Sequence, residues 1–249
     1  MPLNYTVKGQ GNKNIVLLHG WGGSMESLQG LQDELAKTGA YRVYNIELPG
    51  FGESNIPKGK VFTLDDYVSS IDLFISTNII NKPVLVGHSF GGKIALAYTI
   101  RKEDKVRNLV LINSSGLKPK NSFKRYALLL PTKTFGLLFS LPVLNKIKSP
   151  IRAVYYKLIV RERDYLRSKE LQETLKNVLK INLDVRIDKI NVDTLLIWGE
   201  KDSYTPLWMG ERLSKLLPNA RLEVIQGAKH NLPLVNPQIV ASMIRLHIK

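Results

Sequence analysis

The sequence predicts an α/β fold in which a mostly parallel β-sheet is covered by helices on both faces and carries an inserted helical cap. Three observations support this prediction. Short apolar runs alternate with helical patterns along most of the chain, as strands and helices do around a parallel sheet. The alternation stops over residues 117–189 and then resumes. The 249 residues are enough for one large domain of this kind.

Six short runs of apolar and β-branched residues predict strands that are buried in the sheet. The predicted strands are 15–18, 43–48, 84–86, 109–112, 195–198 and 222–225. Helical patterns between most of them predict helices at 28–37, 64–77, 93–101 and 208–217. A parallel sheet binds its ligands at the carboxyl ends of its strands. The residues that directly follow these runs are therefore the candidates for a functional site.

The interruption divides the chain into two parts. We expect residues 1–116 and 190–249 to form the sheet domain, and residues 117–189 to form the cap. Late in the cap segment, apolar residues recur at helical spacing. These residues are Leu171, Leu175, Val178 and Leu179.

Most of the positive charge lies in the cap segment. The formal net charge is +15, and residues 117–189 hold 17 basic and 6 acidic residues, against 12 and 10 before them and 7 and 5 after them. Such a segment could attract anionic lipid headgroups or an anionic carrier. Lysine-rich helices more often only keep a helix face solvated, and no motif for reading DNA or RNA accompanies the charge. We therefore expect no nucleic-acid partner.

The composition also limits the chemistry and the compartment. The chain has no cysteine, which excludes disulfides, a thiolate nucleophile and a cysteine metal site and favours a reducing compartment. The N-terminus has no signal-like pattern, and no run of about 18 apolar residues occurs. We expect a cytoplasmic protein that is a monomer or a homodimer.

The most informative motif is GHSFGG, which follows the predicted strand 84–86 and precedes the predicted helix 93–101. Ser89 lies at the turn between them. A sharp turn of this kind exposes the serine hydroxyl, and the N–H groups that follow it begin a helix. The glycines on either side allow close packing without Cβ clashes. Ser89 is the candidate nucleophile.

A second glycine-rich motif, HGWGG at residues 19–23, follows the strand 15–18. Acyl transfer passes through an oxyanion, and a donor aimed at that oxyanion stabilises it by roughly 3 kcal/mol. We expect the backbone N–H groups of Trp21 and Phe90 to be these donors. The Trp21 side chain is expected to form a wall of the substrate site.

Two further segments follow strands and offer an acid and a base. Glu200 and Asp202 come after strand 195–198, and Asp202 is favoured because it lies deeper in the loop. His230 comes after strand 222–225 and is the candidate general base. The other three histidines have different expected roles: His88 packs beneath the nucleophile turn, His19 braces its glycine loop, and His247 lies at the surface.

The order Ser89, Asp202, His230 is the chain order of the α/β-hydrolase triad. With GHSFGG and HGWGG, the chain resembles the capped esterases of the α/β-hydrolase superfamily, close to small carboxylesterases including the pimeloyl-carrier-protein methyl ester type. The loop ELPGFGES at residues 47–54 also matches, although Glu47 stands where aspartate is commoner. We expect this difference to affect folding more than catalysis. The likeness covers residues 14–116 and 190–237.

The resemblance implies hydrolysis of a carboxylic ester through an acyl-enzyme, with no metal or organic cofactor. A lactonase, a carbon–carbon bond hydrolase, an acyltransferase or a perhydrolase would use the same serine. Epoxide hydrolases and haloalkane dehalogenases are disfavoured because they need an aspartate in place of Ser89. A ligand-binding receptor of this fold is the alternative without turnover, and an intact triad argues against it.

An apolar stretch of the cap, within residues 123–144, has two interpretations. In the first, its side chains form the cap's own core and its contact with the sheet domain. In the second, some of them line an acyl pocket or form an apolar entrance, which with the neighbouring basic residues would touch lipid or an anionic carrier. In the second interpretation the substrate-binding residues are Trp21, Phe123, Tyr126 and Phe139.

Overall fold

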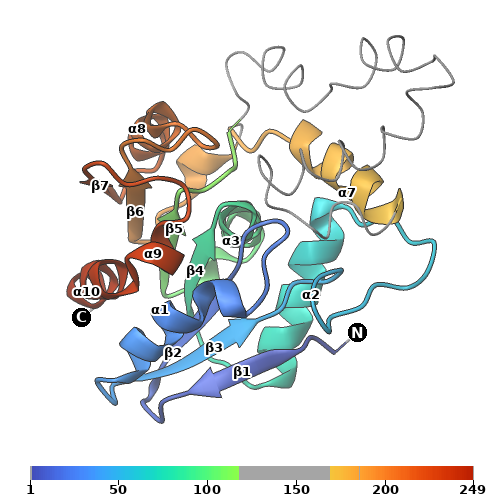
Figure 1. The fold of residues 1–249 in the computed structure, drawn as a ribbon, viewed down its shortest axis with the longest axis horizontal. Helices are drawn as coiled ribbons and strands as arrows, with labels where there is room; N and C mark the ends of the chain where they lie inside the picture. Colours follow the sequence, from blue (N-terminus) through green and yellow to red (C-terminus); the bar gives the residue numbers. More distant parts are fainter. Residues whose placement is uncertain (1, 118–168, 185, 249) are drawn as a thin grey trace, which may run out of the picture.

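A seven-stranded sheet organises the part of the chain that the structure describes. The structure is a computed structural model that describes residues 2–117, 169–184 and 186–248. Along the sheet the strand order is β1-β3-β2-β4-β5-β6-β7. Only β1 runs antiparallel to its neighbour; the other strands are parallel (Figure 1). The α/β fold predicted from the sequence is confirmed.

The six predicted strands are all present, with small changes at their ends. The strands are β1 (Tyr5–Lys8), β2 (Lys13–Leu18), β3 (Tyr41–Ile46), β4 (Val84–His88), β5 (Asn108–Ile112), β6 (Thr194–Gly199) and β7 (Ala220–Ile225). The parallel register sets Leu18 beside Gly87, Gly87 beside Leu111, and Leu111 beside Leu196. The loops that leave β2, β4, β5, β6 and β7 therefore begin at one edge of the sheet.

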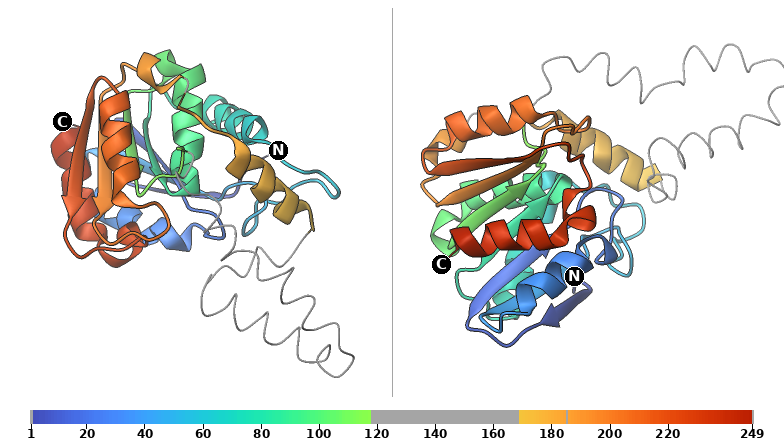
Figure 2. Two further views of the ribbon diagram at one scale, coloured as in Figure 1. Left: turned by 90° about the horizontal axis from the view of Figure 1, so that it is seen from above. Right: turned by 60° about the vertical axis from the view of Figure 1, so that its left-hand side comes forward.

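Helices cover both faces of the sheet, as predicted. The helices are α1 (Glu26–Ala36), α2 (Leu64–Thr77), α3 (Phe90–Arg101), α7 (Lys169–Lys180), α8 (Leu207–Leu216), α9 (Leu232–Val235) and α10 (Pro237–His247), with short 3₁₀ turns at Glu103–Lys105 and Ile187–Lys189. The views of Figure 2 show α1 and α10 on one side of the sheet and α2 and α3 on the other. Two buried apolar clusters correspond to these two sides.

Alternation along the strands explains the two clusters. Ile15 and Leu17 pack toward α1 and α10, whereas Val16 and Leu18 pack toward α2 and α3. Successive side chains of a strand point to opposite faces, so a strand covered on both sides needs an unbroken apolar run. The central strands β2, β4 and β5 have such runs, which is why they were predictable.

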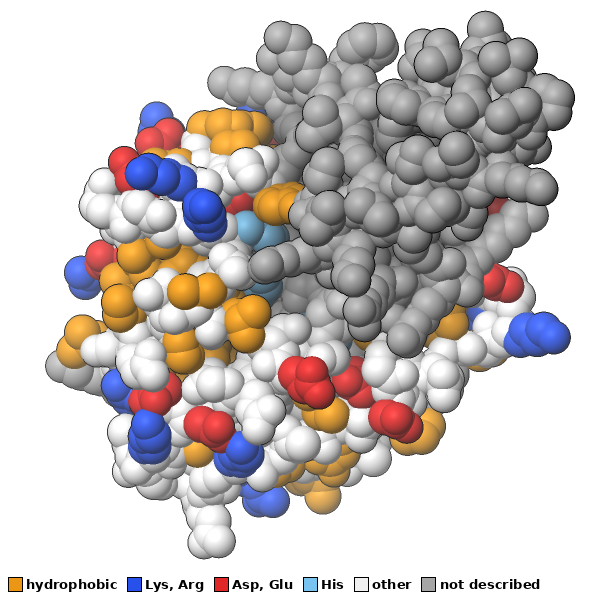
Figure 3. Space-filling model, in the orientation of Figure 1, with side chains coloured by type: hydrophobic (Ala, Val, Ile, Leu, Met, Phe, Trp, Pro, Cys, Tyr) orange, Lys and Arg blue, Asp and Glu red, His pale blue; other side chains and the backbone are white. Residues whose placement is uncertain are grey.

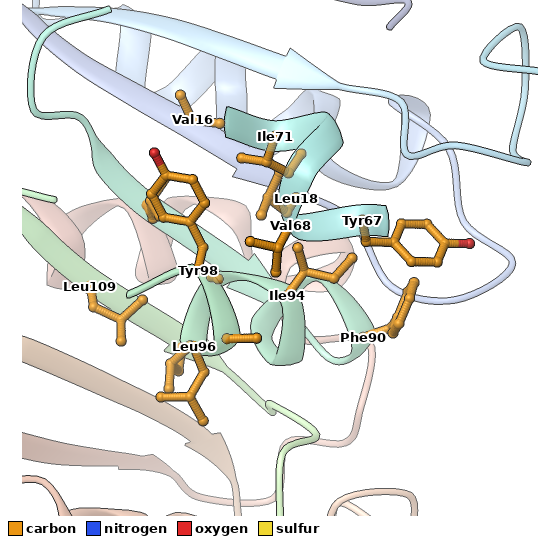
Figure 4. Close-up of a cluster of buried hydrophobic side chains, with 14 of the residues drawn as sticks. Val16, Leu18, Tyr67, Val68, Ile71, Phe90, Ile94, Leu96, Tyr98 and Leu109 are labelled. Carbon is orange, nitrogen blue, oxygen red and sulfur yellow. The ribbon is translucent and has the colours of Figure 1, made fainter. Parts of the chain in front are cut away.

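The buried cluster on the side of α2 and α3 also packs against the start of α3, the helix that follows Ser89. Figure 4 shows Tyr67 and Val68 of α2 facing Phe90 and Ile94 of α3, and all four side chains are buried. The Tyr67 and Phe90 rings meet edge to face with centroids 5.0 Å apart. This contact fixes the first residue of α3 against the core, directly beyond the candidate nucleophile.

Three elements of the described structure were not predicted. Strand β1 is an edge strand whose residues are mostly exposed, so it lacks the apolar run of a buried strand. Helix α9 is only four residues long. Helix α10 begins at Pro237, a residue that favours the first turn of a helix, and buries Val240, Ala241 and Ile244; this pattern could have been recognised.

The end of the segment between β5 and β6 packs on the sheet domain. The predicted helix there is α7, and its buried residues are Leu171, Thr174 and Val178, whereas Leu179 is exposed. The Thr174 hydroxyl accepts a hydrogen bond from the Phe62 N–H at 2.9 Å. The buried face of α7 thus contains a threonine that the apolar spacing did not indicate.

Lys93 links α7 to the helix that follows Ser89. Its ammonium group is buried and donates to the carbonyl oxygens of Val178 and Ile181, both at 2.7 Å. Burial lowers the pKa of Lys93 to about 8. A cation at the carboxyl end of a helix satisfies carbonyl groups that have no partner within the helix. Leu183 then donates its N–H to Gly116 O at 3.2 Å, which joins the two ends of the inserted segment.

Among the described residues on the face shown in Figure 3, charged side chains of both signs are interspersed. This agrees with the small positive excess in residues 1–116 and 190–249. Among the residues described, no helix combines the length and the apolar character needed to cross a membrane.

Glu47 is a buried carboxylate that joins three segments. Its Oε2 accepts hydrogen bonds from Asn4 Nδ2 at 2.9 Å and from the Glu53 N–H at 2.8 Å, and its Oε1 lies 3.5 Å from the Met25 N–H. The side chain therefore holds the chain before β1 and the turn after β3 together. This is the structural role expected for the unusual glutamate at this position.

Replacing Glu47 with alanine should lower stability. Glu47→Ala would leave the Asn4 amide and the Glu53 N–H without their buried acceptor, and we expect the free energy of unfolding to fall by about 2 to 3 kcal/mol. Urea denaturation followed by circular dichroism measures this. Glu53→Ala, at an exposed position of the same turn, is the control. Equal denaturation midpoints for the two variants would contradict the role of Glu47.

Candidate active site

The turn after β4 holds Ser89 in a strained backbone conformation. Ser89 has φ of +51° and ψ of −110° and immediately precedes α3. Its N–H donates to Ile112 O at 3.0 Å, and its carbonyl accepts from the Ser115 N–H at 3.0 Å. A positive φ at a residue with a side chain is unfavourable and persists only where the surroundings enforce it. The strand-to-helix turn predicted from GHSFGG is present.

Two glycines allow this turn to pack against the sheet. A Cβ at Gly87 would lie 2.4 Å from Gly92 Cα, and one at Gly91 would lie 2.1 Å from Leu18 O. Both distances are far below van der Waals contact with backbone atoms that cannot move aside. The beginning of α3 can therefore approach β2 and β4 only without side chains at these positions.

His230 lies in the loop after β7 and contacts both predicted partners. Its Nε2 is 3.0 Å from Ser89 Oγ, and its Nδ1 is 2.7 Å from Asp202 Oδ2. A carboxylate accepts only, so Nδ1 carries the proton, and Nε2 is left to accept the hydroxyl proton of Ser89. The structure brings together the three side chains that the sequence singled out.

Asp202 is buried in the turn after β6 and has several donors. The Tyr204 and Thr205 N–H groups donate to its Oδ1 at 2.7 and 2.9 Å. Burial alone would raise the pKa of Asp202, but the hydrogen bond and charge of His230 and the hydrogen bonds from Thr205 outweigh burial and hold this pKa below its usual value. Asp202 is therefore ionised at neutral pH. Glu200 points elsewhere, accepting from the Gly227 N–H at 2.8 Å.

Thr205 is a residue of the site that the sequence did not reveal. Its hydroxyl lies 2.6 Å from Asp202 Oδ2, 2.9 Å from Asn113 O and 3.3 Å from His230 Nδ1. The spacing Asp-x-x-Thr, typical of a turn closed by the aspartate side chain, was the available signal.

The backbone of His230 is held from the neighbouring strand ends. His88 Nε2 lies 2.8 Å from His230 O, so that nitrogen carries a proton and donates. Burial, the largest effect, and the nearby charge of His230 lower the pKa of His88 to about 3. His88 is therefore neutral where it holds the His230 carbonyl. Asn113 Nδ2 also donates to His230 O at 2.8 Å, a contact that the sequence did not reveal.

His19 fixes the glycine loop after β2. Its Nε2 accepts from the Leu48 N–H at 3.0 Å, so its Nδ1 carries the proton and donates to Gly20 O at 2.7 Å. Burial lowers the pKa of His19 to about 4, against smaller opposing effects of Gly20 and Glu47. A Cβ at Gly20 would lie 3.3 Å from Ser89 Cβ, which places this loop beside the serine. The bracing role expected for His19 is confirmed.

Trp21 lies in the same loop, and its side chain packs against two aromatic rings. Its ring meets Phe51 and Phe90 edge to face, with centroids 5.0 and 5.1 Å apart. The Trp21 backbone N–H has no acceptor within the described part of the chain. The Phe90 N–H belongs to the first turn of α3, where N–H groups have no acceptor in the helix. Their role as oxyanion donors stays a prediction.

Other predicted residues lie elsewhere. Phe123, Tyr126 and Phe139 fall outside the described residues. The expectation that His247 is a surface residue is wrong. Its side chain is only 10% exposed, and its Nε2 lies 3.4 Å from Asp193 Oδ1, because α10 turns that face toward the start of β6.

The comparison with known families decides the classification. The sequence model of the family described as alpha/beta hydrolase fold matches residues 13–237, which include every side chain of the candidate site described above. The chain belongs to the α/β-hydrolase family.

This α/β-hydrolase is similar to other hydrolases in sequence and in fold. It is 28% identical to the pimeloyl-[acyl-carrier protein] methyl ester esterase of Neisseria meningitidis serogroup C, over 94% of this chain and 92% of that protein. It is 26% identical to the uncharacterized hydrolase YugF of Bacillus subtilis, over 96% and 91%. Its fold is similar to that of an esterase from Exiguobacterium antarcticum, with a TM-score of 0.77, 22% identity and coverage of 99% and 95%. The protein is thus a hydrolase with esterase-like relatives.

The low pKa of His19 gives this hydrolase an acid-sensitive fold. Between pH 6.5 and about 4 the unfolded chain binds a proton at His19 that the folded protein does not. The contribution of His19 to stability is therefore fully present above pH 6.5 and is lost as the pH falls toward about 4, by at most about 1.4 kcal/mol per pH unit.

We expect His19→Gln to lose less unfolding free energy than wild type between pH 7 and pH 5. Groups common to the two proteins cancel in this difference, which isolates His19. Guanidinium denaturation at a series of pH values measures it. Parallel pH dependence in the two proteins would show that His19 is not kept neutral by the fold.

Proposed function

We propose that this α/β-hydrolase is a serine esterase that cleaves carboxylic esters of small to medium acyl chain. The observation that carries the proposal is the continuous chain of hydrogen bonds from Ser89 Oγ through the His230 ring to Asp202, with distances of 3.0 and 2.7 Å. The same three groups occur in nucleophile, base and acid roles on several unrelated folds. The esterase names of its relatives agree with the proposal.

The first step forms an acyl-enzyme. His230 Nε2 removes the hydroxyl proton of Ser89 as Oγ bonds to the ester carbonyl carbon, and the carbonyl oxygen becomes an oxyanion. The Trp21 and Phe90 N–H groups donate to that oxyanion. The carbonyl then reforms, the bond to the alkoxy oxygen breaks, and His230 returns its proton to the leaving alcohol.

The second step repeats the chemistry with water. His230 removes a proton from water, the hydroxyl bonds to the acyl carbon, and collapse releases the carboxylic acid as Ser89 Oγ regains its proton from His230. These steps call on no metal or organic cofactor. Asp202 keeps the proton of the neutral imidazole on Nδ1 and stabilises the imidazolium that forms in each step.

The substrate site is proposed to lie under the cap of residues 117–189. Trp21 would contribute a wall beside Ser89, and Phe123, Tyr126 and Phe139 would contribute the acyl pocket. The name of the meningococcal relative refers to an ester on an acyl-carrier protein. The 17 basic residues of the cap segment would favour a substrate attached to such an anionic carrier.

A panel of p-nitrophenyl esters of increasing chain length, with lactones beside them, tests the proposal. We expect turnover of the esters and its loss in Ser89→Ala, with the folded structure kept. Ser76→Ala, which changes an exposed serine of α2, is the matched control and should remain active. Ester hydrolysis by Ser89→Ala at the wild-type rate would refute the assignment. A preference for lactones would keep the serine but replace the ester in the proposed reaction.

The two carboxylates of the loop after β6 should differ sharply. Asp202→Asn removes the acceptor that fixes the His230 tautomer, and we expect kcat to fall by about 10⁴. Glu200→Gln affects a contact to Gly227 away from His230, so kcat should remain close to wild type. Steady-state kinetics on one ester compares them. A larger loss in Glu200→Gln would mean that the acid has been misassigned.

A further inference from the structure

Asn113 is a fully buried polar residue at the carboxyl end of β5. Its relative exposure is 0%, and its φ of +44° lies in the left-handed region. Asparagine tolerates this conformation better than most residues with a side chain. It stands between the loop of Asp202 and the loop of His230 and contacts both.

The backbone groups of Asn113 face the first of these loops and the strand that leads to it. Its N–H donates to Ile197 O at 2.9 Å. Its carbonyl oxygen lies 2.9 Å from the Thr205 hydroxyl, which also contacts Asp202. The left-handed turn thus aims the carbonyl at a residue that supports the candidate acid.

The side-chain amide joins the two loops directly. Asn113 Oδ1 accepts from the Gly199 N–H at 2.8 Å, while Nδ2 donates to Lys229 O at 3.1 Å and to His230 O at 2.8 Å. An N–H faces the oxygen and two carbonyls face the nitrogen, so the amide has one acceptable orientation. Both amide protons and the amide oxygen are therefore used.

We propose that Asn113 is a positioning residue for the reaction, which ties the loop of Asp202 to the loop of His230 and so sets the distance between their side chains. The inference rests on the proposed function. The hydrogen bonds of the Asn113 side chain go to Gly199, Lys229 and His230 and not to Ser89. The side chain therefore acts through the peptide groups that carry the acid and the base. His88 supplies the other donor to His230 O, so that carbonyl is held from two strands.

The consequence for turnover follows from geometry. Without the amide, the Gly199 N–H and the Lys229 carbonyl lose a buried partner, and among the described residues the His230 carbonyl keeps the contact to His88. Displacement of a catalytic group by about 1 Å can lower the rate about 100-fold. Substrate binding beside Trp21 would not change, so the loss should appear in kcat and not in KM.

Asn113→Gly is the sharpest variant, because glycine adopts a positive φ without strain, so the side chain is removed while the turn is kept. We expect kcat for a p-nitrophenyl ester to fall about 10- to 100-fold, with KM nearly unchanged. Asn113→Asp keeps an acceptor for the Gly199 N–H but places oxygen against two carbonyls, so kcat should fall at least as far. Asn108→Ala is the control, since Asn108 lies at the other end of β5 and contacts Asp193.

A second readout does not depend on ester hydrolysis. Nitrogen-15 chemical shifts of labelled histidine report which ring nitrogen carries the proton, and His230→Gln identifies the signal. Wild type and Asn108→Ala should show His230 protonated at Nδ1. Asn113→Gly should show a mixture of tautomers, because the ring is no longer held against Asp202.

The outcomes separate this inference from the proposed function. A folded Asn113→Gly protein with wild-type kcat and a wild-type tautomer would overturn the inference, as would failure of both Asn113 variants to fold, which would assign the residue to folding alone. A third outcome is that wild type cleaves no ester but Asn113→Gly still shows a mixture of His230 tautomers. That result would support the positioning role of Asn113 and refute the esterase proposal.

Discussion

The parallel pairing of β2, β4, β5, β6 and β7 is the constraint on which the candidate site depends. It brings the carboxyl ends of strands from distant parts of the chain to one edge of the sheet. Each strand rises about 3.3 Å per residue, so a shift of one residue in β6 or β7 would separate Asp202 from His230 by more than a hydrogen bond tolerates. Such a shift would also turn buried side chains to the opposite face. The apolar packing on both faces therefore maintains the geometry of the polar site.

The strained turn at Ser89 depends on the same packing. Its positive φ destabilises the fold by about 1 to 3 kcal/mol. Close contact of α3 with the sheet and hydrogen bonds to Ile112 and Ser115 offset this strain. On the other side of α3, Phe90 lies against Tyr67 and Trp21. The hydroxyl position is thus fixed before any ligand arrives, which is what electrostatic stabilisation of a developing charge requires.

Sequence reasoning recovered the features whose signal is local. Ser89, Asp202 and His230 were predictable because each directly follows an apolar run and the carboxyl ends of parallel strands converge. Asn113 was not, because its importance depends on contacts with backbone groups of other loops. Thr205 had only the local signal of the Asp-x-x-Thr spacing, which does not reveal its contact with Asn113. Strand β1 was missed for a different reason: an exposed edge strand has no apolar pattern to recognise.

The two ends of the inserted segment between β5 and β6 are held together, and this affects how such enzymes can change during evolution. Gly116 and Leu183 are joined by a backbone hydrogen bond, and Lys93 holds the end of α7 to the sheet domain. Since the two ends are already together, added or deleted residues between them would alter the entropy of loop closure only slowly with length. The length and sequence of that segment could therefore change while the register of the sheet and the candidate site stay as they are.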